Sequence, residues 1–257
     1  MAEPFIQVRG LTQRFGGTDV LRDVDLDVFH GETLVILGSS GGGKSVLLKH
    51  LPGLLAPLGG TVLVNGVEIS GLGERALGPI RRQMGIMFQG GALFDSFNVA
   101  ENVAFPLRES GMTRETEIMA RVADALQIVR LPGEQDKMPS ELSGGMRKRV
   151  ALARAVVGKP ACVLYDEPHA GLDPVTADSI DHLIKDLQTE HGMTNVVITH
   201  DMRSVFHIAD RIVFLEKGVI EWTGTPAELR TTEHPGLRAF VAGDSGEPWK
   251  RTSAAEI

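Results

Sequence analysis

Runs and alternations of apolar residues divide the chain into strands of two kinds. Thr33–Leu37 is a continuous, largely apolar run that leads directly into glycines, which is typical of a central parallel strand covered on both faces. Val20–Val28 instead alternates between apolar and polar residues, which is the period of a strand with one exposed face. We therefore expect a buried, mostly parallel sheet and an antiparallel β region near the surface.

Other buried runs alternate with segments of helical periodicity. Further strands are predicted at Met84–Phe88, Ala161–Tyr165, Asn195–Thr199 and Arg211–Leu215. Helices are predicted at Lys44–Leu55, Glu115–Arg130 and Val175–Leu187, the last two because apolar side chains recur on one face. This alternation is typical of an α/β fold with a mostly parallel sheet.

The segment between Gln89 and Ser143 has a different character. It shows helical periodicity and turn residues but no strongly apolar strand pattern, so we expect an inserted helical subdomain at about residues 93–160. We expect a single domain over residues 1–243. Residues 244–257 are rich in polar and small residues and are predicted to form a flexible C-terminal tail.

Charge and cysteine content narrow the classes of partner. The 26 basic and 33 acidic residues give a formal net charge of −7, and the basic residues are mostly dispersed, so no nucleic-acid partner is expected. The cluster Arg147–Arg149 is either a solvated helix face or a source of positive potential near a phosphate. Cys162, the single cysteine, lies in an apolar run and is predicted to be a buried structural thiol.

No segment of the sequence is predicted to cross a membrane. The longest uncharged stretch, Leu51–Val67, contains two prolines and four glycines, which favours a loop and a strand. The N-terminus lacks a basic region followed by an apolar run, which a secretion signal requires. We therefore expect a cytoplasmic protein.

A phosphate-binding loop is predicted directly after the first buried strand. The spacing Gly-x4-Gly-Lys-Ser lies between that strand and a helix, which is the context the motif requires. Backbone N–H groups of the loop converge on phosphates, Lys44 reaches the β and γ oxygens, and the Ser45 hydroxyl ligates Mg²⁺. We expect ATP and Mg²⁺ as cofactors, and the nucleotide-binding residues of the loop are Gly38, Ser39, Ser40, Gly41, Gly42, Gly43, Lys44 and Ser45.

Acidic and polar residues end the other predicted strands, and α/β proteins bind their ligands at that edge of the sheet. Asp166 is suited to hold Mg²⁺ through its water shell, and Glu167 can polarise the water that attacks the γ-phosphate. His200 follows another strand and can donate a hydrogen bond to the γ-phosphate. Gln89 can reach Mg²⁺ or the attacking water. We therefore expect catalytic roles for Glu167, His200 and Gln89, and metal binding by Ser45, Gln89 and Asp166.

Two further nucleotide contacts carry a weaker signal. Phe15 precedes the loop and is interpreted either as a ring that stacks on adenine or as a core residue. Asp173 is either a nucleotide contact or the N-cap of a helix that begins at Pro174.

A second glycine-rich motif, Leu142–Met146, lies after Gln89 and before Tyr165–Glu167. With these motifs in this order, the sequence resembles the ATP-binding subunits of ABC transporters over about residues 5–240. The resemblance implies the P-loop NTPase fold of an ABC nucleotide-binding domain, with ATP hydrolysis. It also implies a separate integral membrane permease, and therefore a peripheral position on the cytoplasmic face of the membrane.

The same resemblance implies that a second copy of the chain completes the site. In the family two subunits pair head to tail, so Ser143, Gly144 and Gly145 of one copy would close on the γ-phosphate held by the partner's Lys44. ATP then bridges the two copies and favours the closed homodimer. Hydrolysis of ATP removes this preference for the closed state.

A narrower resemblance concerns the cargo. Met87–Pro106, with Met146 where glutamine is more usual, looks like the Mla or MCE-type phospholipid transport ATPases. This likeness implies lipid transport and a lipid-binding MCE-type protein in the complex. Family members contact the permease directly after the residue corresponding to Gln89, so Leu93, Phe94 and Phe97 either form that docking surface or pack the helical subdomain.

The sequence departs from the family pattern at three positions. His169 replaces the usual Thr, Ser or Phe, Val46 replaces a second hydroxyl residue, and Phe15 lacks the hydroxyl of the usual tyrosine. None of these changes removes a phosphate or Mg²⁺ ligand.

Kinases and GTPases do not require Leu142–Met146, so the sequence does not favour either class. The alternatives that remain are an amino-acid or metal importer and a soluble assembly ATPase.

Overall fold

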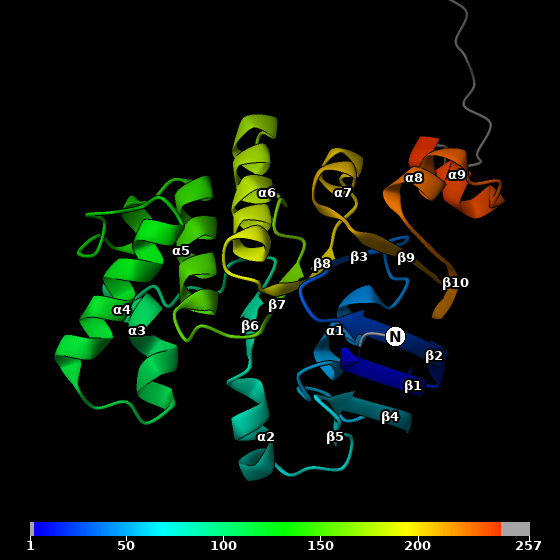
Figure 1. Cartoon of the computed structure of the whole chain (residues 1–257), viewed down its shortest axis with the longest axis horizontal. Helices are drawn as coiled ribbons and strands as arrows, with labels where there is room; N and C mark the ends of the chain where they lie inside the picture. Colours follow the sequence, from blue (N-terminus) through cyan, green and yellow to red (C-terminus); the bar gives the residue numbers. More distant parts are fainter. Residues whose placement is uncertain (1–2, 243–257) are drawn as a thin grey trace, which may run out of the picture.

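Two sheets organise residues 3–242, the part of the chain that the computed structural model describes (Figure 1). The first sheet is antiparallel and has the order β2-β1-β4-β5, with β1 (Pro4–Phe15), β2 (Thr18–Phe29), β4 (Gly59–Val64) and β5 (Val67–Glu68). The second sheet has the order β10-β9-β3-β8-β7-β6. Its strands are β3 (Thr33–Leu37), β6 (Met84–Met87), β7 (Cys162–Asp166), β8 (Thr194–Ile198), β9 (Arg211–Glu216) and β10 (Val219–Gly224).

The second sheet is parallel except at β10, which pairs antiparallel with β9. The predicted α/β fold, with a mostly parallel sheet and a separate antiparallel region, is therefore confirmed. Because β3, β6, β7 and β8 run in the same direction, their carboxyl ends lie at one edge of the sheet. This edge gathers the polar residues that follow these strands.

Alternate residues of the buried strands face two different cores. Val35 and Leu37 belong to one hydrophobic cluster, whereas Leu34 and Ile36 belong to the other. The first cluster includes residues of the helices, and the second includes residues of the antiparallel sheet. The strand Thr33–Leu37 is fully buried for this reason, because every side chain meets one of the two layers.

The helices lie around these sheets (Figure 1). Their bounds are α1 (Lys44–His50), α2 (Glu74–Arg81), α3 (Val99–Glu109), α4 (Glu115–Ile128), α5 (Gly144–Val156), α6 (Pro174–Thr189), α7 (Met202–Ile208), α8 (Pro226–Thr231) and α9 (Pro235–Ala242), with a 3-10 turn η1 (Pro139–Glu141). Helices α3, α4 and α5 lie together at one end of the molecule, within the range expected for the helical subdomain. The limits of that subdomain remain a prediction, and the predicted tail, residues 244–257, lies outside the described residues.

Helix α1 is shorter than predicted, because it ends at His50 rather than at Leu55. Leu51 keeps helical backbone angles, but Pro52 has no N–H to continue the helical hydrogen bonds, and Gly53 follows with a φ of 68°. The chain then turns back, so that the Leu55 N–H donates to the Lys49 carbonyl at 3.2 Å. The apolar residues after His50 therefore belong to a turn and not to the helix.

Cys162 is fully buried, as predicted, and burial raises the pKa of its thiol. None of the helices within residues 3–242 has the length and the apolar character that a membrane crossing requires.

Candidate functional site

The predicted phosphate loop connects β3 to α1 and packs closely against β9. Gly38 has a φ of 151°, and a Cβ at this position would lie 1.9 Å from the Leu215 carbonyl oxygen. Gly43 has a φ of 99°, and a Cβ there would lie 2.8 Å from the Val20 carbonyl oxygen. Only glycine fits both backbone conformation and space at these positions, so the path of the loop depends on them.

The Lys44 ammonium is held inside this loop. Its Nζ donates to the carbonyl oxygens of Gly38 at 2.8 Å and Ser39 at 2.7 Å, and the residue is 9% exposed. Burial lowers the pKa of Lys44, and nearby carboxylates, Glu167 first, oppose this shift. The cation is thus fixed where the loop curves, which is the position that a phosphate-binding lysine requires.

Ser45 and Asp166 meet across the sheet edge. The Ser45 hydroxyl donates to Asp166 Oδ1 at 3.0 Å, which joins the first turn of α1 to the end of β7. A hydroxyl and a carboxylate are oxygen ligands of the kind that Mg²⁺ takes, usually together with water and substrate phosphate. The residues present therefore fit the predicted Mg²⁺ ion.

Glu167 and His200 also lie together, as predicted from their strands. His200 Nδ1 is 2.9 Å from Glu167 Oε2, and the two side chains are 70% and 15% exposed. The Glu167 N–H donates to the Ile198 carbonyl at 3.0 Å, which ties the loop after β7 to the end of β8. Glu167 has a φ of 50°, which is uncommon outside glycine and is frequent at functional sites.

Gln89 is exposed two residues after the end of β6, and its backbone makes a contact that the sequence did not indicate. Lys148 of α5 donates its Nζ to the Gln89 carbonyl oxygen. Lys148 is 7% exposed, and burial lowers the pKa of its ammonium. A solvated helix face is therefore the wrong interpretation for Lys148, which instead links α5 to the residue after β6.

Ser143 and the glycines after it begin α5 and do not reach the loop at Lys44 in the same chain. The Ser143 hydroxyl caps α5 by accepting from the Met146 N–H at 3.3 Å. A Cβ on Gly145 would lie 2.4 Å from Thr176 Cγ2, so glycine is required for the approach of α5 to α6. In Figure 1 α5 and α1 lie apart, with β6 and β7 between them in this view.

The structure bears on the alternative interpretations of Phe15 and Asp173. Phe15 is 46% exposed at the end of β1, so the core interpretation is wrong and the ring is available for stacking. Asp173 caps α6, because its carboxylate accepts from the Val175 and Thr176 N–H groups at 3.0 Å. A hydrogen bond from the Thr176 hydroxyl lowers the pKa of Asp173.

Glu216 and Asp181 are supporting residues that the sequence analysis missed. The Glu216 carboxylate accepts from the Ser39 hydroxyl at 3.0 Å and from the Ser39 N–H at 3.3 Å. Asp181 on α6 lies 2.7 Å from Nε2 of His169. The only sequence signals were a carboxylate at the end of a strand and the unusual identity of His169.

These contacts define a P-loop nucleotide-binding fold with carboxylates at the sheet edge. The ABC transporter family model matches residues 21–170, which is more than half of the chain. The chain belongs to the ABC transporter family, as its ATP-binding, ATP-hydrolysing component.

Two curated relatives illustrate its place in the family. The chain is 42% identical over 238 residues to the probable ribonucleotide transport ATP-binding protein mkl of Mycobacterium leprae, covering 93% of this chain and 69% of the relative. It is 40% identical over 221 residues to the methionine import ATP-binding protein MetN of Brucella abortus, covering 86% of this chain and 60% of the relative. The mkl protein of Mycobacterium tuberculosis is matched over 66% of its length, so the chain spans about two thirds of such relatives.

Solved structures show the same fold. The ATP-binding cassette MJ0796, in a dimeric post-hydrolysis state bound to ADP and Pi, matches with a TM-score of 0.79 and 32% identity, over 86% of this chain and 98% of that one. The cbiO1 protein from Clostridium perfringens, part of the ABC transporter complex cbiONQ, matches with a TM-score of 0.81 and 30% identity, over 94% of this chain and 99% of that one.

Proposed function

We propose that this chain is the ATP-hydrolysing subunit of a membrane transporter and that it works as a homodimer. The observation that carries the proposal is the split arrangement of its phosphate-binding elements. Lys44, Ser45 and Asp166 lie at one sheet edge, whereas Ser143 lies at the start of α5. Within residues 3–242 no hydrogen bond or ion pair joins Ser143 to the loop Gly38–Ser45.

The hydrolytic chemistry follows from the residues at the sheet edge. Mg²⁺ would be held by Ser45, Asp166 and Gln89, and it would supply positive charge at the β and γ phosphates. Lys44 neutralises phosphate charge, and Glu167 accepts a hydrogen bond from the attacking water. His200 then donates to a γ-phosphate oxygen, and in the present structure its Nδ1 lies 2.9 Å from Glu167 Oε2.

Dimerisation completes the site in this proposal. The cap of α5 leaves Gly144 and Gly145 at a helix start, where backbone N–H groups and the helix dipole favour an anion. The γ-phosphate bound to the partner's Lys44 is the anion that we assign to this helix start. The dimeric state of MJ0796 supports the pairing of two copies. In the proposed head-to-tail pairing, Phe15 would add a contact to adenine and Asp173 a contact across the interface.

The surface after Gln89 is proposed to dock the permease. Leu93 packs against the core, whereas Phe94 is 40% exposed and lies 5.1 Å from Phe97 and 4.8 Å from Phe105 between ring centroids. Beside these rings is a groove of about 640 Å³ lined by Arg81, Arg82, Met84, Phe105, Leu107, Met112, Arg121 and Arg154, among others. Exposed aromatic rings beside a groove are typical of a protein contact. We assign this surface to a permease segment, which would hold the subunit at the cytoplasmic face of the membrane.

The proposed cargo is a phospholipid, delivered with an MCE-type lipid-binding protein, on the strength of Met87–Pro106 and Met146. The names of the relatives favour a second candidate, because they refer to ribonucleotide transport and methionine import. An importer of a small polar molecule is therefore the alternative.

Purification of the intact complex in detergent tests both levels of the proposal. We expect a multi-span permease to co-purify, phospholipid to be found by mass spectrometry, and phospholipid to stimulate ATP hydrolysis after reconstitution. The absence of any membrane partner would refute the transport role. Stimulation by methionine or a ribonucleotide, and not by phospholipid, would refute the lipid cargo alone.

A further inference from the structure

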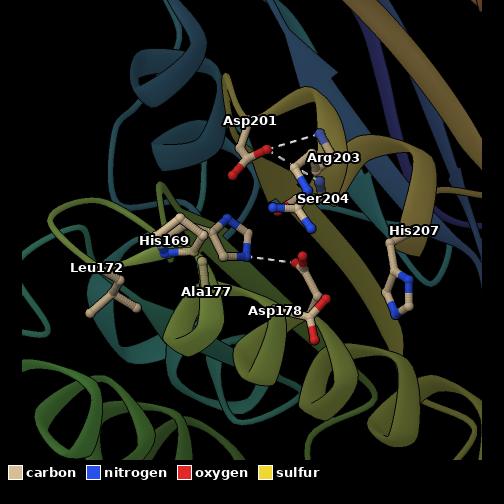
Figure 2. A pocket seen from close by; sticks show the side chains of 10 residues that line it. His169, Leu172, Ala177, Asp178, Asp201, Arg203, Ser204 and His207 are labelled. Carbon is tan, nitrogen blue, oxygen red and sulfur yellow. Dashed lines mark hydrogen bonds and ion pairs between the residues drawn. The ribbon is translucent and has the colours of Figure 1, made fainter.

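A buried ion pair lies behind the loop that carries Glu167. His169 Nε2 is 2.7 Å from Asp181 Oδ1, and the two side chains are only 6% and 5% exposed (Figure 2). Apart from this contact, neither atom has a hydrogen-bond partner within residues 3–242. Well-packed apolar side chains are often as stable as such a pair, so stability alone does not account for it.

The second ring nitrogen of His169 faces the strand end that leads to His200. Its Nδ1 lies 3.5 Å from Thr199 Oγ1, and Thr199 is 1% exposed. The same hydroxyl accepts from the Asp201 N–H at 3.1 Å. Nε2 thus faces a carboxylate and Nδ1 faces a hydroxyl, so each ring nitrogen has one polar partner.

The buried ring of His169 is not packed against protein on every side. A cavity of about 260 Å³ adjoins the ring, and Figure 2 shows His169 and His207 on different sides of it. The titratable groups around this cavity, besides His169, come from α6, from α7 and from the N-cap of α7, and they are Asp178, Asp181, Asp201, Arg203 and His207. With open space beside the ring, its orientation depends on Asp181 and Thr199.

Two contacts therefore join the loop after β7 to the loop after β8, one at an exposed level and one at a buried level. Glu167 and His200 meet at the exposed level, at 2.9 Å. His169 and Thr199 meet at the buried level, where Asp181 anchors the ring to α6. A change in the position of His169 would move both members of the exposed pair, because Glu167 is two residues from His169 and His200 directly follows Thr199.

Helix α6 connects the ion pair to the start of α5. Thr176 in its first turn is the residue that closely approaches Gly145. Asp181 lies further along the same helix. One rigid element thus touches both the predicted γ-phosphate contact of the second copy and the support of the hydrolytic pair.

We infer that His169 is a positioning residue for ATP hydrolysis, which sets the geometry of Glu167 and His200 through its contacts with Asp181 and Thr199. The inference rests on the proposed roles of Glu167 and His200. It assigns no contact between His169 and the nucleotide, so it concerns the rate of hydrolysis and not ATP affinity.

The double variant His169→Phe/Asp181→Leu separates positioning from stability. It replaces the ion pair by apolar groups, whereas His169→Phe alone leaves a buried carboxylate without a partner and is expected to lower Tm. For the double variant of the full chain we expect a Tm near that of the wild type. Its kcat should fall about tenfold or more at unchanged KM for ATP, because small misplacements of catalytic groups are costly.

Further variants supply the controls. His169→Gln keeps a donor and an acceptor and should restore most of kcat, and His207→Gln, in the same cavity, should leave kcat unchanged. Thr199→Val leaves the His169–Asp181 pair intact. It therefore tests the positioning role of His169 if the double variant does not fold. Reduced kcat of Thr199→Val at wild-type Tm supports the inference, and wild-type kcat in Thr199→Val overturns it.

Two results distinguish failure of this inference from failure of the proposed function. If Glu167→Gln abolishes turnover while the double variant retains wild-type kcat, His169 has no positioning role and the hydrolytic site stands. If Glu167→Gln retains full turnover, the proposed site itself is wrong and the inference falls with it.

Discussion

Ser45 and Asp166 are joined by a hydrogen bond of 3.0 Å although 121 residues separate them in the sequence. The contact exists because β3 and β7 are both parallel to β8 and deliver their carboxyl ends to one edge. A hydroxyl from a helix start and a carboxylate from a strand end are thereby brought together, as the proposed Mg²⁺ site requires.

Replacement of Asp166 by asparagine should weaken Mg²⁺ binding, because the amide keeps the shape of the side chain but loses its charge. We expect the Mg²⁺ concentration for half-maximal ATP hydrolysis to rise by about tenfold or more. Titration of activity with Mg²⁺ at saturating ATP measures this shift. Asp178→Asn, an exposed carboxylate on α6, is the control and should leave the titration unchanged. An unaltered midpoint for Asp166→Asn would remove Asp166 from the metal site.

The carboxylate of Glu167 is expected to be essential for turnover and dispensable for ATP binding. Glu167→Gln should therefore abolish hydrolysis and accumulate an ATP-bound dimer, because the bridging γ-phosphate is no longer removed. Phosphate release and sedimentation in the presence of MgATP measure these two effects. The exposed Glu190→Gln is the matched control. Undiminished hydrolysis by Glu167→Gln would show that another group polarises the water.

Replacement of Lys44 by alanine should weaken ATP binding by about 1.5–3 kcal/mol, the value of a hydrogen bond to a charged group. Isothermal titration with ATP measures the loss. Lys49→Ala is a close control, because Lys49 lies on the same helix and is exposed. If both variants bind ATP like the wild type, the loop Gly38–Ser45 is not the phosphate site.

The elements with a clear hydrophobic period were predictable, and β1 shows why others were not. Its buried residues include Phe5, Ile6, Val8 and Leu11, but the pairing of β1 with β2 shifts register several times. These irregularities, with Gly10 at a φ of 58°, interrupt the period of two residues on which strand prediction depends. The half-exposed edge strand β10 was missed because its pattern is only weakly apolar.

The residues of the candidate site also include some that were predictable from the sequence and some that were not. The positions of Lys44, Asp166, Glu167 and His200 were predictable because each lies at the end of a buried strand or in the segment that follows one. The contact between Ser39 and Glu216 joins residues 177 positions apart and has no periodic signal. Such supporting contacts depend on the folded packing, so the sequence alone could not reveal them.

Arginine at Ser143 should block closure of the dimer, because a large side chain would occupy the space assigned to the partner's γ-phosphate. We expect ATP binding by the monomer to persist while ATP-dependent dimerisation is lost. Ser143→Ala controls for the lost helix cap, which is worth about 1 kcal/mol. Thr113→Arg, at an exposed turn, controls for the added charge. A normal ATP-dependent dimer of Ser143→Arg would contradict the role of Ser143 in the second copy.

Gly145 and Gly144 should respond in opposite ways to alanine. A Cβ on Gly145 would lie 2.4 Å from Thr176 Cγ2, whereas a Cβ on Gly144 would lie 3.8 Å from its nearest neighbour, Leu172. Gly145→Ala should therefore lower the free energy of unfolding by about 1–3 kcal/mol through overpacking. Gly144→Ala should be neutral or slightly stabilising, because alanine is the better helix former.

The clash at Gly145 has a specific remedy. Thr176→Ser removes the methyl group that the new Cβ meets and keeps the hydroxyl that donates to Asp173 at 2.5 Å. In a double-mutant cycle followed by urea denaturation, Gly145→Ala should cost much less in the Thr176→Ser background than in the wild type. Equal costs in both backgrounds would mean that α5 and α6 do not approach each other as closely as the structure shows. The link from the start of α5 to Asp181 and His169 would then lose its first contact.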